Sequence, residues 1–93
     1  MSQKELEPNF WSLIGYIKVS PARLNCIKII GTEYKMPKEI AKESEMRITQ
    51  ISNALHDLKE KEIVFCLNED NIKGRLYKNT NLGLELLEEL NKI

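Results

Sequence analysis

A switch in hydrophobic period about two-thirds of the way along the chain constrains the fold more than any other feature of the sequence. Four large apolar residues recur at steps of three, four and three: Ile48, Ile51, Leu55 and Leu58. This spacing places them on one face of an α-helix, which we predict to extend from about residue 48 to 61. The residues that follow, Ile63–Leu67, are β-branched and aromatic and therefore predict a strand.

The predicted strand leads into a β-hairpin. Asn68–Asn71 is a cluster of turn-forming residues, and Gly74 follows it closely. Arg75–Asn79 then alternates polar and apolar side chains, which is typical of a half-buried strand. The tip of this hairpin, residues 68–74, is polar and partly basic, and we call it the wing.

Two helices are predicted upstream of residue 31. Ser20 is a favoured N-cap, Pro21 is favoured at the first helical position, and Gly31 is expected to end this helix in a left-handed conformation. Before it, Phe10–Val19 is a compact apolar stretch that permits a short helix, broken or bent near Gly15.

Two more helices complete the predicted set. Tyr34–Met36 is interpreted as an extended link, and Pro37 opens a short helix that continues to about Ser44. Thr80 is the predicted cap of a last helix. The apolar stripe of that helix consists of Leu82, Leu86, Leu87 and Leu90.

Helices followed by a two-stranded hairpin predict a mainly α fold of the winged helix-turn-helix type. The 93 residues suffice for one domain, at 10–93, after a loose polar arm at 1–9. Charged residues make up 30% of the chain, and the longest apolar-rich stretch is far too short to span a membrane. No signal-peptide pattern opens the sequence, so we expect a soluble cytoplasmic protein.

Several motifs occur in the order found in one protein family: Ser20–Arg23, Pro37–Ala41, Ile51–Leu58, Ile63–Asn68 and Gly74–Tyr77, with Thr80 and Gly83 behind. Together they resemble the small archaeal winged helix-turn-helix transcriptional regulators related to the MarR and ArsR groups, over about residues 10–90. The resemblance implies a DNA-reading helix at 48–61 and a wing on the DNA backbone. Two positions depart from the family: Glu62 stands where Gly is frequent, at a conformational cost if its φ is positive, and Asn79 stands where Leu is usual.

Polar side chains opposite the apolar face of the long helix are the candidate base contacts. We call this the outer face, and it consists of Thr49, Asn53, His56 and Glu60. Gln50 and Ser52 flank it, and Arg47 stands at the helix start. Asn and Gln can bond bidentately to adenine, Ser and Thr suit several bases, and Arg47 suits a phosphate or a guanine. His56 is either a phosphate contact or an exposed bystander, and the alternative for the whole set is a solvated helix face.

Basic residues outside this helix are the candidate phosphate contacts. Lys73 and Arg75 flank the wing glycine and suit phosphate or the minor groove. The alternative for Lys73 is a charged edge strand that discourages aggregation, and for Arg75 a pairing with a carboxylate of the scaffold. Lys38, with Lys35 and Lys42, borders the first helix of the motif, where neighbouring glutamates partly cancel its charge.

Charge and chemistry exclude several classes of function. Fourteen basic residues balance fourteen acidic ones, so binding to nucleic acid must depend on where the charges lie. One His and two Cys cannot complete a zinc site within one subunit, and no phosphate loop or nucleophile motif suggests an enzyme or a cofactor. Cys26 and Cys66 are interpreted as buried thiols rather than a redox sensor.

Two functions from different classes remain. The first is a homodimeric transcriptional regulator that binds double-stranded DNA, and the alternative is a winged-helix module for protein–protein interaction. Phe10, Trp11 and Tyr16 belong either to the core or to a dimer interface shared with the leucines of the last helix.

Overall fold

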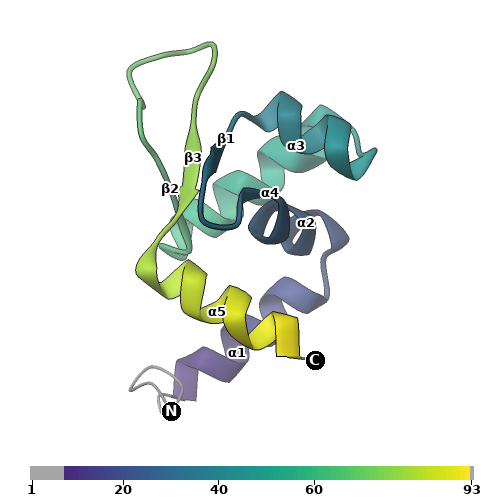
Figure 1. Cartoon of the computed structure of the whole chain (residues 1–93), viewed down its shortest axis with the longest axis vertical. Helices are drawn as coiled ribbons and strands as arrows, with labels where there is room; N and C mark the ends of the chain where they lie inside the picture. Colours follow the sequence, from purple (N-terminus) through teal and green to yellow (C-terminus); the bar gives the residue numbers. More distant parts are fainter. Residues whose placement is uncertain (1–7, 93) are drawn as a thin grey trace.

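The computed structural model describes residues 8–92 and contains five helices around a small sheet (Figure 1). The elements in chain order are α1 (Pro8–Lys18), α2 (Pro21–Ile30), β1 (Tyr34–Lys35), α3 (Pro37–Ser44), α4 (Ile48–Glu60), β2 (Val64–Cys66), β3 (Tyr77–Asn79) and α5 (Asn81–Lys92). The predicted mainly α class with a hairpin is therefore confirmed.

The predicted helix boundaries agree with hydrogen bonds at the helix ends. Ser20 Oγ accepts from the backbone N–H of Arg23 at 3.3 Å, and Thr80 Oγ1 accepts from that of Gly83 at 3.0 Å. α2 ends at Gly31, whose φ of 55° is positive as expected, but its ψ of −126° lies outside the left-handed helical region. That combination is open mainly to glycine, so the residue type still explains the helix end.

The first helix differs from its prediction. α1 begins at Pro8, two residues before the predicted start, and it continues through Gly15 without a break. A glycine inside a helix lowers its stability without ending it when neighbouring apolar residues are buried, and Phe10, Ile14 and Ile17 are buried here. Residues 1–7 of the predicted arm lie outside the described residues.

The sheet has three strands rather than the two of the predicted hairpin. β1 pairs with β3, and β3 pairs with β2, all antiparallel, in the order β1-β3-β2. The segment interpreted as a link is thus an edge strand, with Tyr34 opposite Lys78. Two residues are too few to produce a strand signal, and only a partner remote in the chain makes them one. Beyond the paired residues the wing projects past the helices (Figure 1).

The core joins α2, α4 and the sheet. Ile51, Leu55 and Leu58 of α4 are buried as predicted, and they belong to one cluster with Ile27 and Ile63. Ile48 is the exception, because 49% of it is exposed. The buried arc of α4 centres on Ile51, Ala54, Leu55 and Leu58, which leaves the first helical residue outside it.

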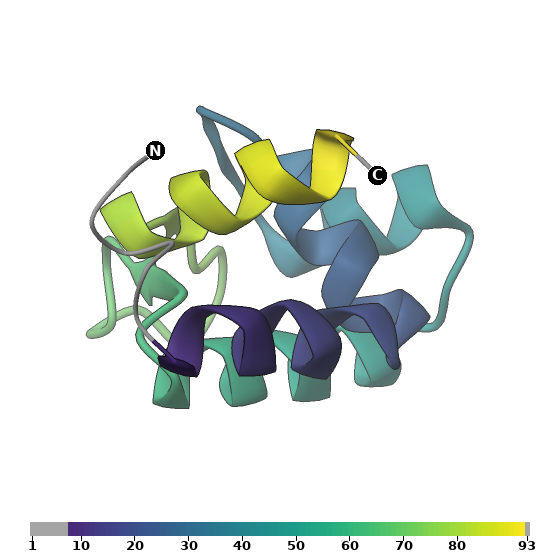
Figure 2. The same cartoon turned by 90° about the horizontal axis from the view of Figure 1, so that it is seen from below.

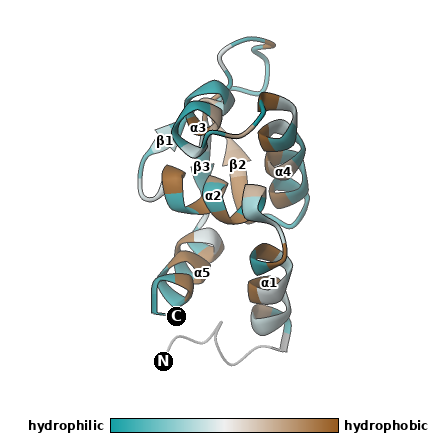
Figure 3. Ribbon diagram, turned by 90° about the vertical axis from the view of Figure 1, so that its right-hand side faces the viewer, coloured by the Kyte–Doolittle hydropathy of each residue, from teal (hydrophilic) through white to brown (hydrophobic). Residues whose placement is uncertain are grey.

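α1 and α5 lie at the end of the molecule opposite the wing (Figures 1 and 3). Phe10, Leu86 and Leu90 are buried there, so they belong to the core. Trp11 packs edge-on against Phe10 yet remains 52% exposed. Figure 2, seen from below, shows α1 and α5 across this end of the molecule, where the two helices contact each other. Within residues 8–92, no helix is long and apolar enough to cross a membrane.

Candidate nucleic-acid interface

Three polar side chains on or beside the outer face form no hydrogen bonds with other described residues. Thr49, Ser52 and Asn53 are exposed on α4, and none of their side chains has a hydrogen-bond partner within residues 8–92. The helix that carries them is held from behind by its buried residues. The packed helix therefore fixes the positions of these three side chains, and their polar groups are available to a ligand.

Two candidate residues at the start of α4 share a contact. Gln50 Oε1 accepts from the backbone N–H of Arg47 at 3.3 Å, which satisfies a helix N-terminal group. The Gln50 amide must give up this bond before it can pair bidentately with a base. The guanidinium of Arg47 is exposed and forms no ion pair among the described residues.

His56 faces a carboxylate one turn further along the outer face. Its Nε2 lies 3.1 Å from Glu60 Oε1, and both side chains are about two-thirds exposed (69% and 66%). Glu60 places negative charge at the far end of the face, whereas the first two turns of α4 carry no acidic side chain.

The wing is held by its own side chains. Asn68 Nδ2 donates to the Gly74 carbonyl at 3.1 Å, and Asn68 Oδ1 accepts from the Leu76 N–H at 2.8 Å. Arg75 Nε donates to the Asn71 carbonyl at 2.8 Å, with a longer bond from Nη2 to the Glu69 carbonyl. Of the two roles considered for Arg75, the alternative pairing with a scaffold carboxylate is not seen among the described residues, because the guanidinium binds loop carbonyls instead. Its guanidinium fixes the shape of the wing.

An ion pair ties the wing to α4. The ammonium of Lys59 on α4 bonds to the carboxylate of Glu69 in the wing. This hydrogen bond raises the pKa of Lys59 and lowers the pKa of Glu69. Both groups are exposed, so the pair orients the wing more than it stabilises the fold.

Cations without acidic partners remain on this side of the molecule. Lys35 pairs with Glu43 at 3.5 Å, but Lys38 and Lys73 are exposed and form no ion pair among residues 8–92. With Arg47, the N-cap of α4, these lysines are three exposed cations without an ion-pair partner in the described part of the chain.

A groove of about 560 Å³ separates α4 from the wing, and we call it the helix–wing groove. Five of the predicted site residues line it: Lys38, Ser52, His56, Lys73 and Arg75. Thr49, Asn53, Arg47 and Gln50 are not among its lining residues. The structure thus divides the predicted set between this groove and the exposed surface of α4.

A network that the sequence does not reveal positions α4 from behind. Arg23 on α2 bonds to Asp57 Oδ2 on α4 at 3.2 Å and donates through Nη1 to the Tyr16 carbonyl on α1 at 2.9 Å. The guanidinium also stacks on the Tyr16 ring, with Cζ 3.8 Å from the centroid. No local signal reveals this network, because its members lie on three different helices.

The hydrogen bonds of Asn79 explain why this residue stands where Leu is usual in the resembled family. It is buried, and Nδ2 donates to the carbonyls of Ile27 at 3.2 Å and Gly31 at 2.9 Å. The Ile27 carbonyl lies in the last turn of α2 and also accepts from the Gly31 backbone N–H, and the Gly31 carbonyl lies just past the helix, so Asn79 secures the C-terminal end of α2. Glu62 has a φ of 60°, so it bears the conformational cost anticipated for the other departure.

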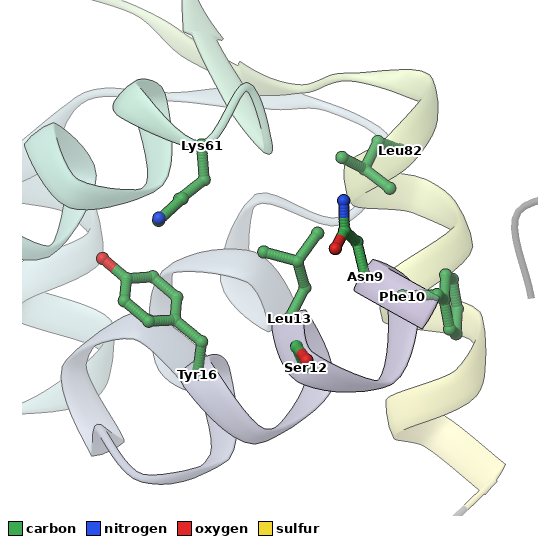
Figure 4. Close-up of a pocket in the computed structure, with 7 residues that line it drawn as sticks. All are labelled: Asn9, Phe10, Ser12, Leu13, Tyr16, Lys61 and Leu82. Atoms are coloured by element: carbon green, nitrogen blue, oxygen red, sulfur yellow. The ribbon is translucent and has the colours of Figure 1, made fainter. Parts of the chain in front are cut away.

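A second pocket, of about 480 Å³, lies beside α1 and away from the wing (Figure 4). Tyr16 and Lys61 stand at one side of it, with the Lys61 ammonium 5.5 Å from the Tyr16 centroid. Leu13 and Leu82 supply apolar lining. None of the predicted DNA-contact residues belongs to this pocket.

The thiols differ in environment. Cys26 is buried, and desolvation raises its pKa to about 12. Cys66 is only half-buried, so the prediction of two buried thiols is wrong for this one. The two remain unlinked, and no cluster of three or more metal-ligating side chains occurs in the described part of the chain.

Comparison with known proteins supports the fold. No family model and no curated protein matches the chain. A doubly substituted form of ZitR from Lactococcus lactis is similar in structure, with a TM-score of 0.67 and 14% sequence identity. The match covers 76% of this chain and 49% of the other, so the chain spans about half the length of ZitR. At this identity the likeness establishes the fold, which is a winged helix.

Proposed function

We propose that this protein is a sequence-specific DNA-binding transcriptional regulator, with α4 in the major groove and the wing on the DNA backbone. One observation carries the proposal: Thr49, Ser52 and Asn53 stand exposed and without internal partners on a helix whose opposite face is buried. The major groove admits an α-helix, and these side chains can bond to base edges there. Gln50 is a further candidate once its bond to Arg47 opens.

Phosphate contacts come from the surrounding cations. Lys38 and Lys73 line the helix–wing groove together with Ser52 and His56 of α4, and Arg47 caps the start of the same helix. His56 and Arg75 are assigned weaker roles, since one faces Glu60 and the other binds wing carbonyls. The resemblance to the small archaeal regulators supports this division between base and phosphate contacts.

The regulator is proposed to act as a two-fold dimer. The end formed by α1 and α5 lies away from the wing, and Trp11 exposes about half of its surface there (52%). Such motifs read paired half-sites roughly 34 Å apart, which requires two copies. Sedimentation at tens of micromolar, with Trp11→Ala as the variant, tests this assembly, and a monomeric wild type contradicts it.

The first experiment measures affinity for a random duplex pool as a function of salt. Each phosphate that is neutralised adds about −0.9 to the slope of log affinity against log salt. We expect a slope near −3 per subunit if three cations contact phosphates, at about 0.9 each. Absence of binding at low salt by a folded sample would reject the regulator in favour of the protein-interaction module.

The second experiment distinguishes base-specific contacts from phosphate contacts, and it uses a sequence selected from the pool. Asn53→Ala is expected to weaken the selected site by roughly 1–3 kcal/mol more than random DNA, because a bidentate contact is lost. Lys73→Ala should weaken both about equally, since phosphate contacts carry little direct sequence information. Lys92→Ala, on α5 at the opposite end, is the matched control. Equal losses on both sequences for Asn53→Ala would show that α4 does not read bases.

A further inference from the structure

The helix–wing groove contains two exposed isoleucines. Ile48 is 49% exposed and Ile72, in the wing, is 90% exposed. Both line the groove together with the lysines at positions 38 and 73. Exposed apolar groups between cations suit a ligand that combines apolar edges with negative charge.

The chemistry of the groove narrows the choice of ligand. Lys59 is occupied by Glu69, and Arg75 is occupied by wing carbonyls. Lys38 and Lys73 remain for the ligand, on α3 and on the wing. A DNA strand carries phosphates along its backbone and, at each thymine, a methyl group on the major-groove edge.

The position of Ile48 decides which part of the strand it meets. It is the first residue of α4, about 70° from the centre of the buried arc at about 100° per residue. Ser52 is its neighbour one turn later, about 40° away. The N-terminal residues of a recognition helix are those that reach base edges. Ile48 is therefore directed to the bases, whereas the two free lysines suit the phosphates on either side.

We propose that the helix–wing groove holds one strand of the duplex, and that Ile48 reads the 5-methyl group of a thymine in that strand. This inference rests on the proposed function and adds a specificity residue to it. The residue was expected to be part of the core. Its exposure is instead what makes it available to a base.

The test replaces each thymine of the selected site, one at a time, by deoxyuridine, which removes only the methyl group. At one position the wild-type protein should bind roughly fourfold more weakly, as expected for the loss of one buried methyl group. Ile48→Ala should bind the thymine and uracil forms of that site equally. Val19→Ala is the matched control, since it removes an exposed apolar group that does not line the groove, and it should keep the fourfold preference.

Ile48→Ser, which replaces the apolar side chain by a short polar one, is the second variant if Ile48→Ala lowers the melting temperature too far for binding measurements. It too should lose the preference for the methyl group. Three outcomes would overturn the inference. Wild-type binding could stay unchanged at every uracil substitution, the selected half-site could contain no thymine, or the preference for thymine could persist in both variants of Ile48. Failure to bind any duplex would instead refute the proposed function itself.

Discussion

Gly83 and Gly15 are both helical glycines, yet alanine should have opposite effects at the two positions. Gly83 lies in the first turn of α5 and is buried. A Cβ atom there would overlap the carbonyl oxygen of Ile63 and lie 3.0 Å from Asn79 Oδ1. At Gly15, in α1, a Cβ would meet nothing within 4 Å.

Two opposing free-energy changes decide whether alanine raises or lowers the stability at each position. Alanine is more favourable than glycine inside a helix by about 0.5–1 kcal/mol. At Gly83 this gain opposes an overpacking cost of about 1–3 kcal/mol. The obstacle is backbone that cannot rotate away, and the Ile63 oxygen also accepts from the Thr80 backbone and side chain, both at 3.0 Å. We expect Gly83→Ala to lower the free energy of unfolding by about 1–2 kcal/mol.

Thermal and urea unfolding followed by circular dichroism measure both variants. For a domain of this size, 1 kcal/mol corresponds to about 4–8 °C in Tm. Gly83→Ala should therefore melt roughly 4–16 °C below the wild type, and Gly15→Ala roughly 2–8 °C above it. A Gly83→Ala protein as stable as the wild type would show that α5 does not approach the end of α4 so closely.

Three further predictions concern residues with long-range contacts or unusual environments. Arg23→Met removes the ion pair with Asp57 and should lower the free energy of unfolding by about 1–2 kcal/mol; an unchanged urea midpoint would contradict it. Glu62→Gly relieves the positive φ and should raise stability by about 0.5–1 kcal/mol, whereas a lower melting temperature would count against strain at this residue. Burial raises the pKa of Cys26 to about 12, so its thiol stays protonated as pH rises past the ordinary value of 9.0. Mass spectrometry should show alkylation of Cys66 in the native protein and alkylation of Cys26 only after unfolding, and modification of native Cys26 would contradict this.

Much of the fold was predictable because its signals are local. Ser20, Pro37 and Thr80 act on the residues immediately after them, so the starts of α2, α3 and α5 are where the sequence predicts. The period switch after residue 61 likewise depends only on neighbouring side chains. The errors occurred where local signals are weak, as at Gly15, or where pairing is remote, as in β1.

The candidate site was predictable only as a set of residue types. Helical period identified Thr49 and Asn53 as exposed, and the structure agrees. The same period assigned Ile48 to the core, because a four-residue pattern does not show where the buried arc ends. Contacts with α2 and the sheet decide that limit, and they leave Ile48 facing the helix–wing groove.

By itself the sequence determined where every helix after α1 begins, where helix changes to hairpin, and which polar groups stand opposite the apolar face of α4. Only the tertiary structure decided which polar groups are free. Arg23 reaches Asp57 across 34 residues, and Asn79 reaches Gly31 across 48. Helix caps and hydrophobic period act between neighbours in the chain, whereas a hydrogen bond or ion pair needs only proximity in space. The partners of a charged or polar side chain therefore become defined only when the chain has folded.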